Sequence, residues 1–184
     1  MHALVVVDAQ NEFSPEGTRP ASGHAEALAA IERRVEEARR EGRPIAWIRH
    51  HNRPDEPPGF RPGTWGAQYS PGLGPAEDRD VEREFVKDVY GAFTGSDLAA
   101  WLGERGSDEV LLVGFYAHMC VSTTAREGLM RGLAVAVDPA GVASHDLDHA
   151  HLGPLTADEV RRSALLHLAD MGARITPQAA RATT

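Results

Sequence analysis

Short apolar runs alternate along this chain with segments of helical periodicity, and this alternation constrains the fold more than any other feature. Residues 4–7 are a leucine and three valines, a run typical of a strand buried on both faces of a sheet. Residues 24–41 place apolar side chains at helical spacing, and Gly42 is suited to end that helix. Repeated strand–helix units join through right-handed crossovers. We therefore predict an α/β fold with three layers, α/β/α, around a mainly parallel, doubly wound sheet.

The other segments continue this order over a single domain, residues 1–184. Thr156 and Glu159 form the pattern of a capping box before the last helix, and Ser96 is placed to cap an earlier one. Residues 51–80 are rich in proline and glycine and predict a long loop, a feature that often carries function. A loop rich in histidine and aspartate precedes the last helix. The further predicted strands are 44–48, 81–86, 109–115, 133–137 and 173–176, and the further predicted helices are 97–103, 121–130 and 157–171.

Composition excludes several classes of partner. The chain has 184 residues and a formal net charge of −8, which opposes binding to nucleic acid and to anionic membranes. It has no apolar stretch long enough to span a bilayer, and its first residues lack the basic region and cleavage site of a signal peptide. A single cysteine cannot form an intrachain disulfide and fits a reducing compartment. We expect a cytoplasmic protein that acts on a small molecule.

Three reactive side chains follow predicted strands: Asp8, Lys87 and Cys120. In a parallel sheet the carboxyl ends of the strands share one edge, where such folds place their ligand sites. Cys120 also opens a predicted helix, whose unpaired N–H groups and dipole favour the thiolate. Each residue has a structural interpretation as well, since Asp8 could cap a turn, Lys87 could be solvated and Cys120 could be a small buried hydrophobe. Their joint placement on one edge favours a catalytic site.

Three motifs in this order resemble the isochorismatase-like cysteine hydrolases, a family that includes nicotinamidases and N-carbamoylsarcosine amidohydrolase. The motifs are residues 4–13 with Asp8, Lys87 with residues 92–98, and residues 113–125 with Cys120, and Asp138 also matches the family at the end of the next strand. The resemblance implies a catalytic triad of Asp8, Lys87 and Cys120. It also implies a three-layer domain and a homo-oligomer, a dimer or a tetramer. We expect no cofactor.

The chemistry of this family suits these residue types. Asp8 would take the proton of the thiol, Lys87 would supply positive charge, and the thiolate would attack an amide carbonyl to form a thioester that water hydrolyses. The resemblance assigns the oxyanion hole to the backbone N–H groups of Tyr116 and Cys120, and it places a cis peptide bond between Phe115 and Tyr116. We predict hydrolysis of a C–N bond in a small amide or carbamoyl compound.

The second predicted strand ends where nicotinamidases bind a metal through an Asp and histidines. Arg49 stands in place of that Asp here, although His51 is retained. A cation cannot ligate a metal, so we predict no metal, and we expect Arg49 and His51 to line the pocket and bind an anionic substrate group. The alternatives are a metal site that uses His50, His51 and Asp55, and an ion pair between Arg49 and a nearby acid such as Asp55.

The loop rich in histidine and aspartate has the composition of a metal site but no recognised ligand spacing. We predict that the loop is solvated. Its candidate ligands are His145, Asp146, Asp148, His149 and His151.

Further loop residues are candidates for the pocket wall. Besides Arg49 and His51, the candidate substrate-binding residues are Phe13, Trp65, Tyr116 and His118. Trp65 could cover the site or pack at a subunit interface. His118 could contact the substrate or only hold its turn in shape.

Three other functions are open. Vinyl-ether hydrolysis, as in isochorismatase, does not need the cysteine. A non-catalytic nucleotide-binding domain of this fold would carry a glycine-rich phosphate motif after the first strand, where Asp8 and residues 9–11 stand instead. A redox protein would need a partner for Cys120.

Overall fold

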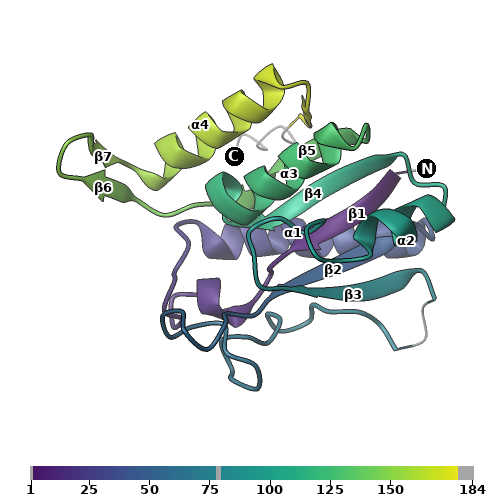
Figure 1. Ribbon diagram of the computed structural model, residues 1–184, viewed down its shortest axis with the longest axis horizontal. Helices are drawn as coiled ribbons and strands as arrows, with labels where there is room; N and C mark the ends of the chain where they lie inside the picture. Colours follow the sequence, from purple (N-terminus) through teal and green to yellow (C-terminus); the bar gives the residue numbers. More distant parts are fainter. Residues whose placement is uncertain (1, 78–79, 178–184) are drawn as a thin grey trace, which may run out of the picture.

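The computed structural model describes residues 2–77 and 80–177 of the chain. At its centre lies a parallel sheet of six strands in the order β3-β2-β1-β4-β5-β8 (Figure 1). The strands are β1 (His2–Val7), β2 (Ile45–His50), β3 (Glu82–Lys87), β4 (Glu109–Phe115), β5 (Ala134–Ala143) and β8 (Arg174–Ile175). The order extends from β1 in both directions, so the predicted doubly wound, mainly parallel sheet is confirmed.

Helices cover both faces of this sheet and give the three predicted layers. One face is covered by α1 (His24–Arg40), and the other by α2 (Leu98–Glu104), α3 (Ser122–Met130) and α4 (Ala157–Asp170) (Figure 1). Leu4 and Val6 pack in the cluster that contains α1, whereas Val5 and Val7 pack in the opposite cluster. A strand with apolar neighbours on both faces needs apolar side chains at consecutive positions, which explains the run at its start. None of the helices in the described parts of the chain is long and apolar enough to span a membrane.

The helix ends follow local chemistry. The predicted capping box is present at α4, where the Thr156 side chain accepts a hydrogen bond from the Glu159 N–H and the Glu159 carboxylate accepts one from the Thr156 N–H. Before α2, Ser96 Oγ accepts a hydrogen bond from the Leu98 N–H at 3.3 Å.

Cys120 does not begin a regular α-helix. It lies in a π-helical turn, Ala117–Val121, that precedes α3.

The region after residue 137 differs from the sequence expectation. Strand β5 continues to Ala143, and its pairing with β4 jumps from Val137 to Val142 because the residues between them bulge out of the ladder. Pro139 lies in this bulge, where its missing N–H costs no ladder hydrogen bond. The segment predicted as a loop forms an exposed antiparallel hairpin, β6 (Leu147–His149) and β7 (Gly153–Leu155). Strands this short, without alternating apolar side chains, give no periodic pattern from which a sequence could predict them.

The long loop after β2 contains no helix and no strand over its described residues 51–77, as predicted. Its backbone is held by three consecutive buried polar residues that follow β1. The Gln10 amide donates to the Ala67 carbonyl at 2.9 Å, and the Asn11 amide donates to the Trp65 carbonyl at 3.0 Å. Glu12 accepts hydrogen bonds from the N–H groups of Phe60, at 3.0 Å, and Thr18, at 3.2 Å. These side chains substitute for the hydrogen bonds that a sheet or helix would have supplied.

We predict that Glu12→Ala lowers the free energy of unfolding by about 2–6 kcal/mol, because each of the two N–H groups left without a partner costs about 1–3 kcal/mol. Glu12→Gln keeps one acceptor oxygen and should lose less. Glu36→Ala, at an exposed position of α1, is the matched control. Urea unfolding of the three variants measures the difference, and equal stability of Glu12→Ala and Glu36→Ala would contradict it.

Candidate active site

Asp8 is the first residue after β1, and its backbone turns sharply there. Its φ angle is 51°, in the left-handed region that residues other than glycine seldom adopt. Its side chain is fully buried. Backbone geometry of this kind persists only where the surrounding structure holds it and is concentrated at functional sites. The turn leaves the carboxylate at the carboxyl edge of the sheet.

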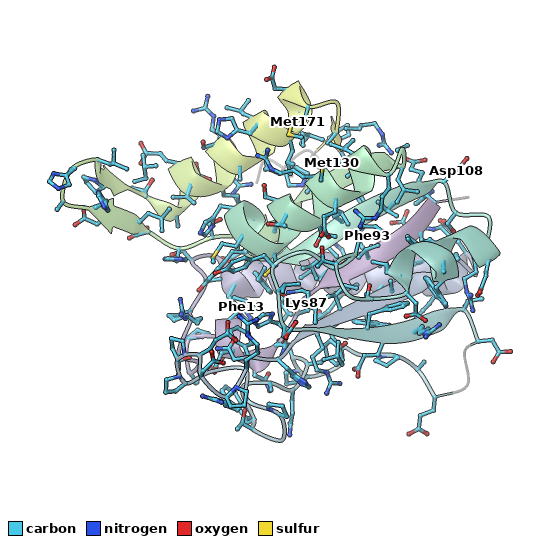
Figure 2. All side chains as sticks on the ribbon, viewed as in Figure 1. Phe13, Lys87, Phe93, Asp108, Met130 and Met171 are labelled. Carbon is cyan, nitrogen blue, oxygen red and sulfur yellow. The ribbon has the colours of Figure 1, made fainter. Side chains whose placement is uncertain are left out.

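Lys87 is the last residue of β3, and its buried ammonium group contacts three side chains. The Nζ atom lies 2.8 Å from Asp8 Oδ2, 3.3 Å from Cys120 Sγ and 3.2 Å from His50 Nδ1. Burial alone would lower the pKa of Lys87, but the charge of Asp8 above all outweighs it and raises the pKa above its usual value. An ammonium group has three N–H donors, so all of them have partners. The structure therefore brings Asp8, Lys87 and Cys120 together, from β1, β3 and the turn after β4 (Figure 2 labels Lys87).

The pKa of the Cys120 thiol differs from the sequence expectation. The exposed fraction of Cys120 is 7%, and burial raises the pKa of its thiol well above the usual range, with a further rise from the charge of Asp8 and an opposing effect of Lys87. The raised pKa opposes the expectation that a helix terminus favours the thiolate, because burial and a neighbouring carboxylate both favour the protonated thiol. The other oxygen of Asp8, Oδ1, is buried with no hydrogen-bond partner among the described residues. It is available to accept a proton.

His50 belongs to this site, although the sequence analysis considered it only as a possible metal ligand. It pairs with Lys87 in the register of β2 and β3. Because Lys87 donates to Nδ1, the imidazole is neutral and its Nε2–H donates to Asn52 Oδ1 at 2.8 Å. Burial lowers the pKa of His50, and the charge of Lys87 lowers it further. The register of two parallel strands, which a single sequence does not reveal, is what makes His50 a neighbour of Lys87.

A pocket of about 440 Å³ opens beside Cys120 and Asp8. Of the predicted substrate-binding residues, Phe13 and Tyr116 line it. The Phe13 ring packs edge-on against the Tyr116 ring at 4.7 Å and tilted against the Phe60 ring at 5.1 Å. The peptide bond between Phe115 and Tyr116 is cis. The other lining residues are Asp8, Arg19, His50, Asn52, Arg53, Glu56, Pro57, Phe60, Asp88, Val89, Tyr90, Met119 and Cys120.

The remaining predicted substrate-binding residues lie outside this lining. Arg49 forms an ion pair with Glu84 at 2.5 Å, and its guanidinium lies 4.5 Å from the centre of the Tyr69 ring. These contacts favour the alternative of an ion pair over the prediction that Arg49 binds substrate, with Glu84 rather than Asp55 as the acid. His51 follows β2 with its side chain outside the pocket, and Trp65 is 51% exposed.

His118 supports the wall of the pocket from behind. Its ring stacks on the Tyr116 ring at 5.4 Å, and its Nδ1 lies 3.1 Å from Ser144 Oγ. His145, from the loop predicted to be solvated, packs against Tyr116 at 4.7 Å and against His118 at 5.2 Å. Of the two roles considered for His118, these contacts favour holding the turn in shape.

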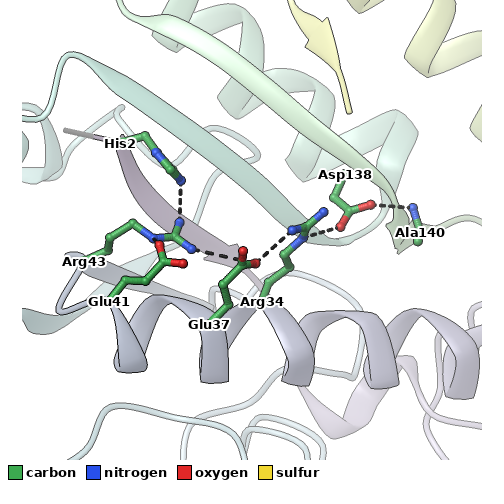
Figure 3. Close-up of polar contacts among 7 residues, drawn as sticks. All are labelled: His2, Arg34, Glu37, Glu41, Arg43, Asp138 and Ala140. Atoms are coloured by element: carbon green, nitrogen blue, oxygen red, sulfur yellow. Dashed lines mark hydrogen bonds and ion pairs between the residues drawn. The ribbon is translucent and has the colours of Figure 1, made fainter. Parts of the chain in front are cut away.

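Asp138, a motif residue of the resemblance, is structural rather than part of the pocket. It is buried, and its Oδ2 accepts a hydrogen bond from Arg34 Nε at 2.6 Å while its Oδ1 accepts one from the Ala140 N–H (Figure 3). Arg34 also contacts Glu37, which faces Arg43 (Figure 3). This network joins α1 to the bulge of β5.

The residues at the end of β2 do not fit a metal ion. Within residues 2–77 and 80–177, no group of three or more histidine, cysteine, aspartate or glutamate side chains is arranged to hold one. Both ring nitrogens of His50 have hydrogen-bond partners, and Arg49 places a paired cation at the position of the expected acidic ligand. His149 and His151 pack against each other on the exposed hairpin at 5.7 Å.

We predict that acidification destabilises the protein between pH 6.5 and about 4. Burial lowers the pKa of His118 from its ordinary 6.5 to about 4, so the folded protein resists a proton that the unfolded chain accepts. The stability contributed by neutral His118 is present above pH 6.5 and is lost as the pH falls toward 4. His118→Asn should therefore show a shallower decline of the urea midpoint than wild type. His167→Asn, at an exposed position of α4, is the control, and a wild-type profile for His118→Asn would contradict the prediction.

Metal removal gives a separate prediction. Dialysis against a strong chelator should leave the activity of the purified protein unchanged, because the residues at the end of β2 offer no ligand set. Elemental analysis before and after dialysis is the measurement. Stoichiometric zinc or iron that is lost together with activity would show that the prediction is wrong.

The comparisons with known proteins identify the family of this chain. The isochorismatase domain family matches residues 2–179. A secreted isochorismatase effector of Verticillium dahliae is 33% identical over 91% of this chain and 83% of its own length. A nicotinamidase/pyrazinamidase of Mycobacterium tuberculosis is 32% identical over 74% of this chain and 83% of its own length. The crystal structure of an isochorismatase from Pseudomonas putida superposes with a TM-score of 0.87, at 31% identity, over 96% of this chain and 87% of that one. The chain belongs to the isochorismatase family of hydrolases.

Proposed function

We propose that this protein is a cysteine hydrolase that cleaves a C–N bond in a small amide or carbamoyl compound through a thioester on Cys120. One observation carries the proposal: the Lys87 ammonium lies within 3.3 Å of Cys120 Sγ and 2.8 Å of Asp8 Oδ2, at the wall of a pocket. A nucleophile, a carboxylate and a cation in mutual contact form the unit that acyl transfer requires. The relative from Mycobacterium tuberculosis, named nicotinamidase/pyrazinamidase, supports amides as the substrate class.

The proposed reaction has two steps. In the first, Asp8 takes the Sγ proton, the sulfur attacks the carbonyl carbon, and the same proton is given to the departing ammonia or amine as the C–N bond breaks. In the second, Asp8 takes a proton from water, whose oxygen attacks the thioester carbonyl. The C–S bond then breaks, the acid leaves, and the proton returns to the sulfur. Lys87 remains charged and stabilises negative charge wherever it lies on Asp8 or on Cys120.

The protonated resting thiol constrains the order of events. Burial and Asp8 raise the pKa of this thiol, which favours the protonated thiol over a free thiolate before the substrate arrives. Proton transfer to Asp8 and attack on the carbonyl then occur together. A thiolate of high pKa is also the stronger nucleophile once it forms.

The developing oxyanion needs N–H donors that are fixed in advance. We assign this role to the backbone N–H groups of Tyr116 and Cys120. Both residues line the pocket, and the peptide bond before Tyr116 is cis. The Tyr116 carbonyl is held by hydrogen bonds from the N–H groups of Met119, at 3.1 Å, and Val121, at 3.2 Å, which fix the turn.

Vinyl-ether hydrolysis is the second candidate, because the family carries its name from isochorismatase. The Lys87–Cys120 contact at 3.3 Å argues against it, since that chemistry does not need a cysteine. A non-catalytic binding domain would not require a carboxylate and an ammonium to be buried together at a pocket, an arrangement with a large desolvation cost.

We predict that Cys120→Ala, Asp8→Asn and Lys87→Met each lower the rate of ammonia release from a panel of small amides by roughly a thousandfold or more. Double variants should lose little further, because residues that act as a unit are not additive. Asp170→Asn, at an exposed position of α4, is the control for expression and folding. Undiminished activity of Cys120→Ala would exclude the thioester mechanism, and multiplicative losses would exclude a triad.

A further inference from the structure

Most charges around the pocket are already paired. Asp8 and Lys87 form one ion pair at 2.8 Å. Arg53 and Glu56 form another, with an Nη2–Oε1 distance of 3.5 Å and a hydrogen bond of 2.6 Å from the Arg53 N–H to Glu56 Oε2. Among the charged residues that line the pocket, only Arg19 and Asp88 have no ion pair with another described residue. Arg19 and Asp88 are therefore the charged lining residues that have no ion-pair partner among the described residues.

The backbone of Arg19 is fixed beside the reacting groups. Its N–H donates to the Glu12 carbonyl at 3.0 Å, and its carbonyl accepts a hydrogen bond from the Tyr116 hydroxyl at 2.5 Å. Tyr116 is the residue to which the proposed oxyanion hole is assigned. Two residues further on, the Ala21 N–H donates to the Phe13 carbonyl at 2.9 Å. The backbone that carries the Arg19 guanidinium is therefore held by hydrogen bonds to Glu12 and to Tyr116.

The surroundings of Arg19 leave its charge unneutralised. Burial raises the pKa of Tyr116 to about 12, so this neighbouring phenol stays neutral at physiological pH. An arginine side chain remains protonated in proteins, and its planar fork binds a carboxylate through two parallel hydrogen bonds. The rings of Phe13, Phe60 and Tyr116 give the pocket an apolar surface between Arg19 and Cys120.

We propose that Arg19 selects the substrate by binding a carboxylate, so that the protein prefers small amides that carry a carboxylate across a short apolar spacer. This inference rests on the proposed amide hydrolysis and names its substrate class. Asp88 would instead favour a cationic substrate, but among the described residues no hydrogen bond anchors its backbone to the pocket in the way that Tyr116 and Glu12 anchor Arg19. Arg19 and Asp88 are both exposed, so the anchored backbone of Arg19 is what distinguishes the two residues.

The test compares glutaramate with glutaramide, which has the same shape but no charge. Wild type should have a KM for glutaramate roughly tenfold lower than for glutaramide, as expected for one charge-assisted pair at a partly solvated site. Arg19→Gln should raise the KM for glutaramate by about the same factor, leave kcat unchanged, and leave glutaramide unaffected. Arg162→Gln, at an exposed position of α4, removes the same charge elsewhere and is the matched control.

An equilibrium measurement separates this inference from the proposed function. Calorimetric titration of glutarate into Cys120→Ala, with and without Arg19→Gln, needs no turnover. Weaker glutarate binding without Arg19 supports the inference even if no amide is hydrolysed, an outcome that would overturn only the proposed function. Amide hydrolysis without any effect of Arg19→Gln on KM or on glutarate binding would overturn the inference and leave the proposed function standing. A wild-type preference for a 4-aminobutanamide substrate over glutaramate would also overturn it, in favour of Asp88.

Discussion

The buried ion pair between Asp8 and Lys87 is the interaction on which the site depends. Two charges removed from water carry a desolvation cost that only good geometry and further hydrogen bonds can offset. Here the ammonium also contacts His50 and Cys120, so each of its donors is used. These contacts are possible only because β1, β2, β3 and β4 are parallel neighbours whose carboxyl ends meet at one edge. The order of the strands therefore brings Asp8, His50 and Cys120 into contact with the same Lys87 ammonium group.

The pocket depends in turn on how an irregular loop is held in place. Residues 51–77 have no ladder of their own, yet they contribute Phe60 and Glu56 to the lining. Their backbone groups are bound by Gln10, Asn11 and Glu12, which lie two to four residues after Asp8. The same short segment thus supplies the Asp8 carboxylate and the anchors of the loop that carries Phe60 and Glu56. A loop fixed by buried side chains keeps its shape without regular secondary structure.

The parts of the molecule that a sequence predicts well are those that local patterns determine. Strands buried on both faces have continuous apolar runs, so the sheet and the edge that holds Asp8, Lys87 and Cys120 could be predicted. Contacts between distant segments could not. Arg49 pairs with Glu84 on the neighbouring strand, and Arg19 reaches the pocket from a loop, because of tertiary packing that no local pattern records. The hairpin of β6 and β7 was missed because its strands are too short for a periodic signal.

At Cys120, the effect expected from a helix N-terminus is opposed by burial and by the neighbouring Asp8 carboxylate. A helix N-terminus lowers a thiol pKa by a modest electrostatic term, whereas burial beside a carboxylate acts in the opposite direction and over a shorter distance. Burial and the charge of Asp8 raise the pKa of the thiol, and the Oδ1 atom of Asp8 has no hydrogen-bond partner among the described residues. Oxidants and alkylating agents react with the thiolate rather than with the thiol. Under the proposed mechanism, the burial that raises the pKa of the Cys120 thiol would therefore also slow its reaction with oxidants and alkylating agents.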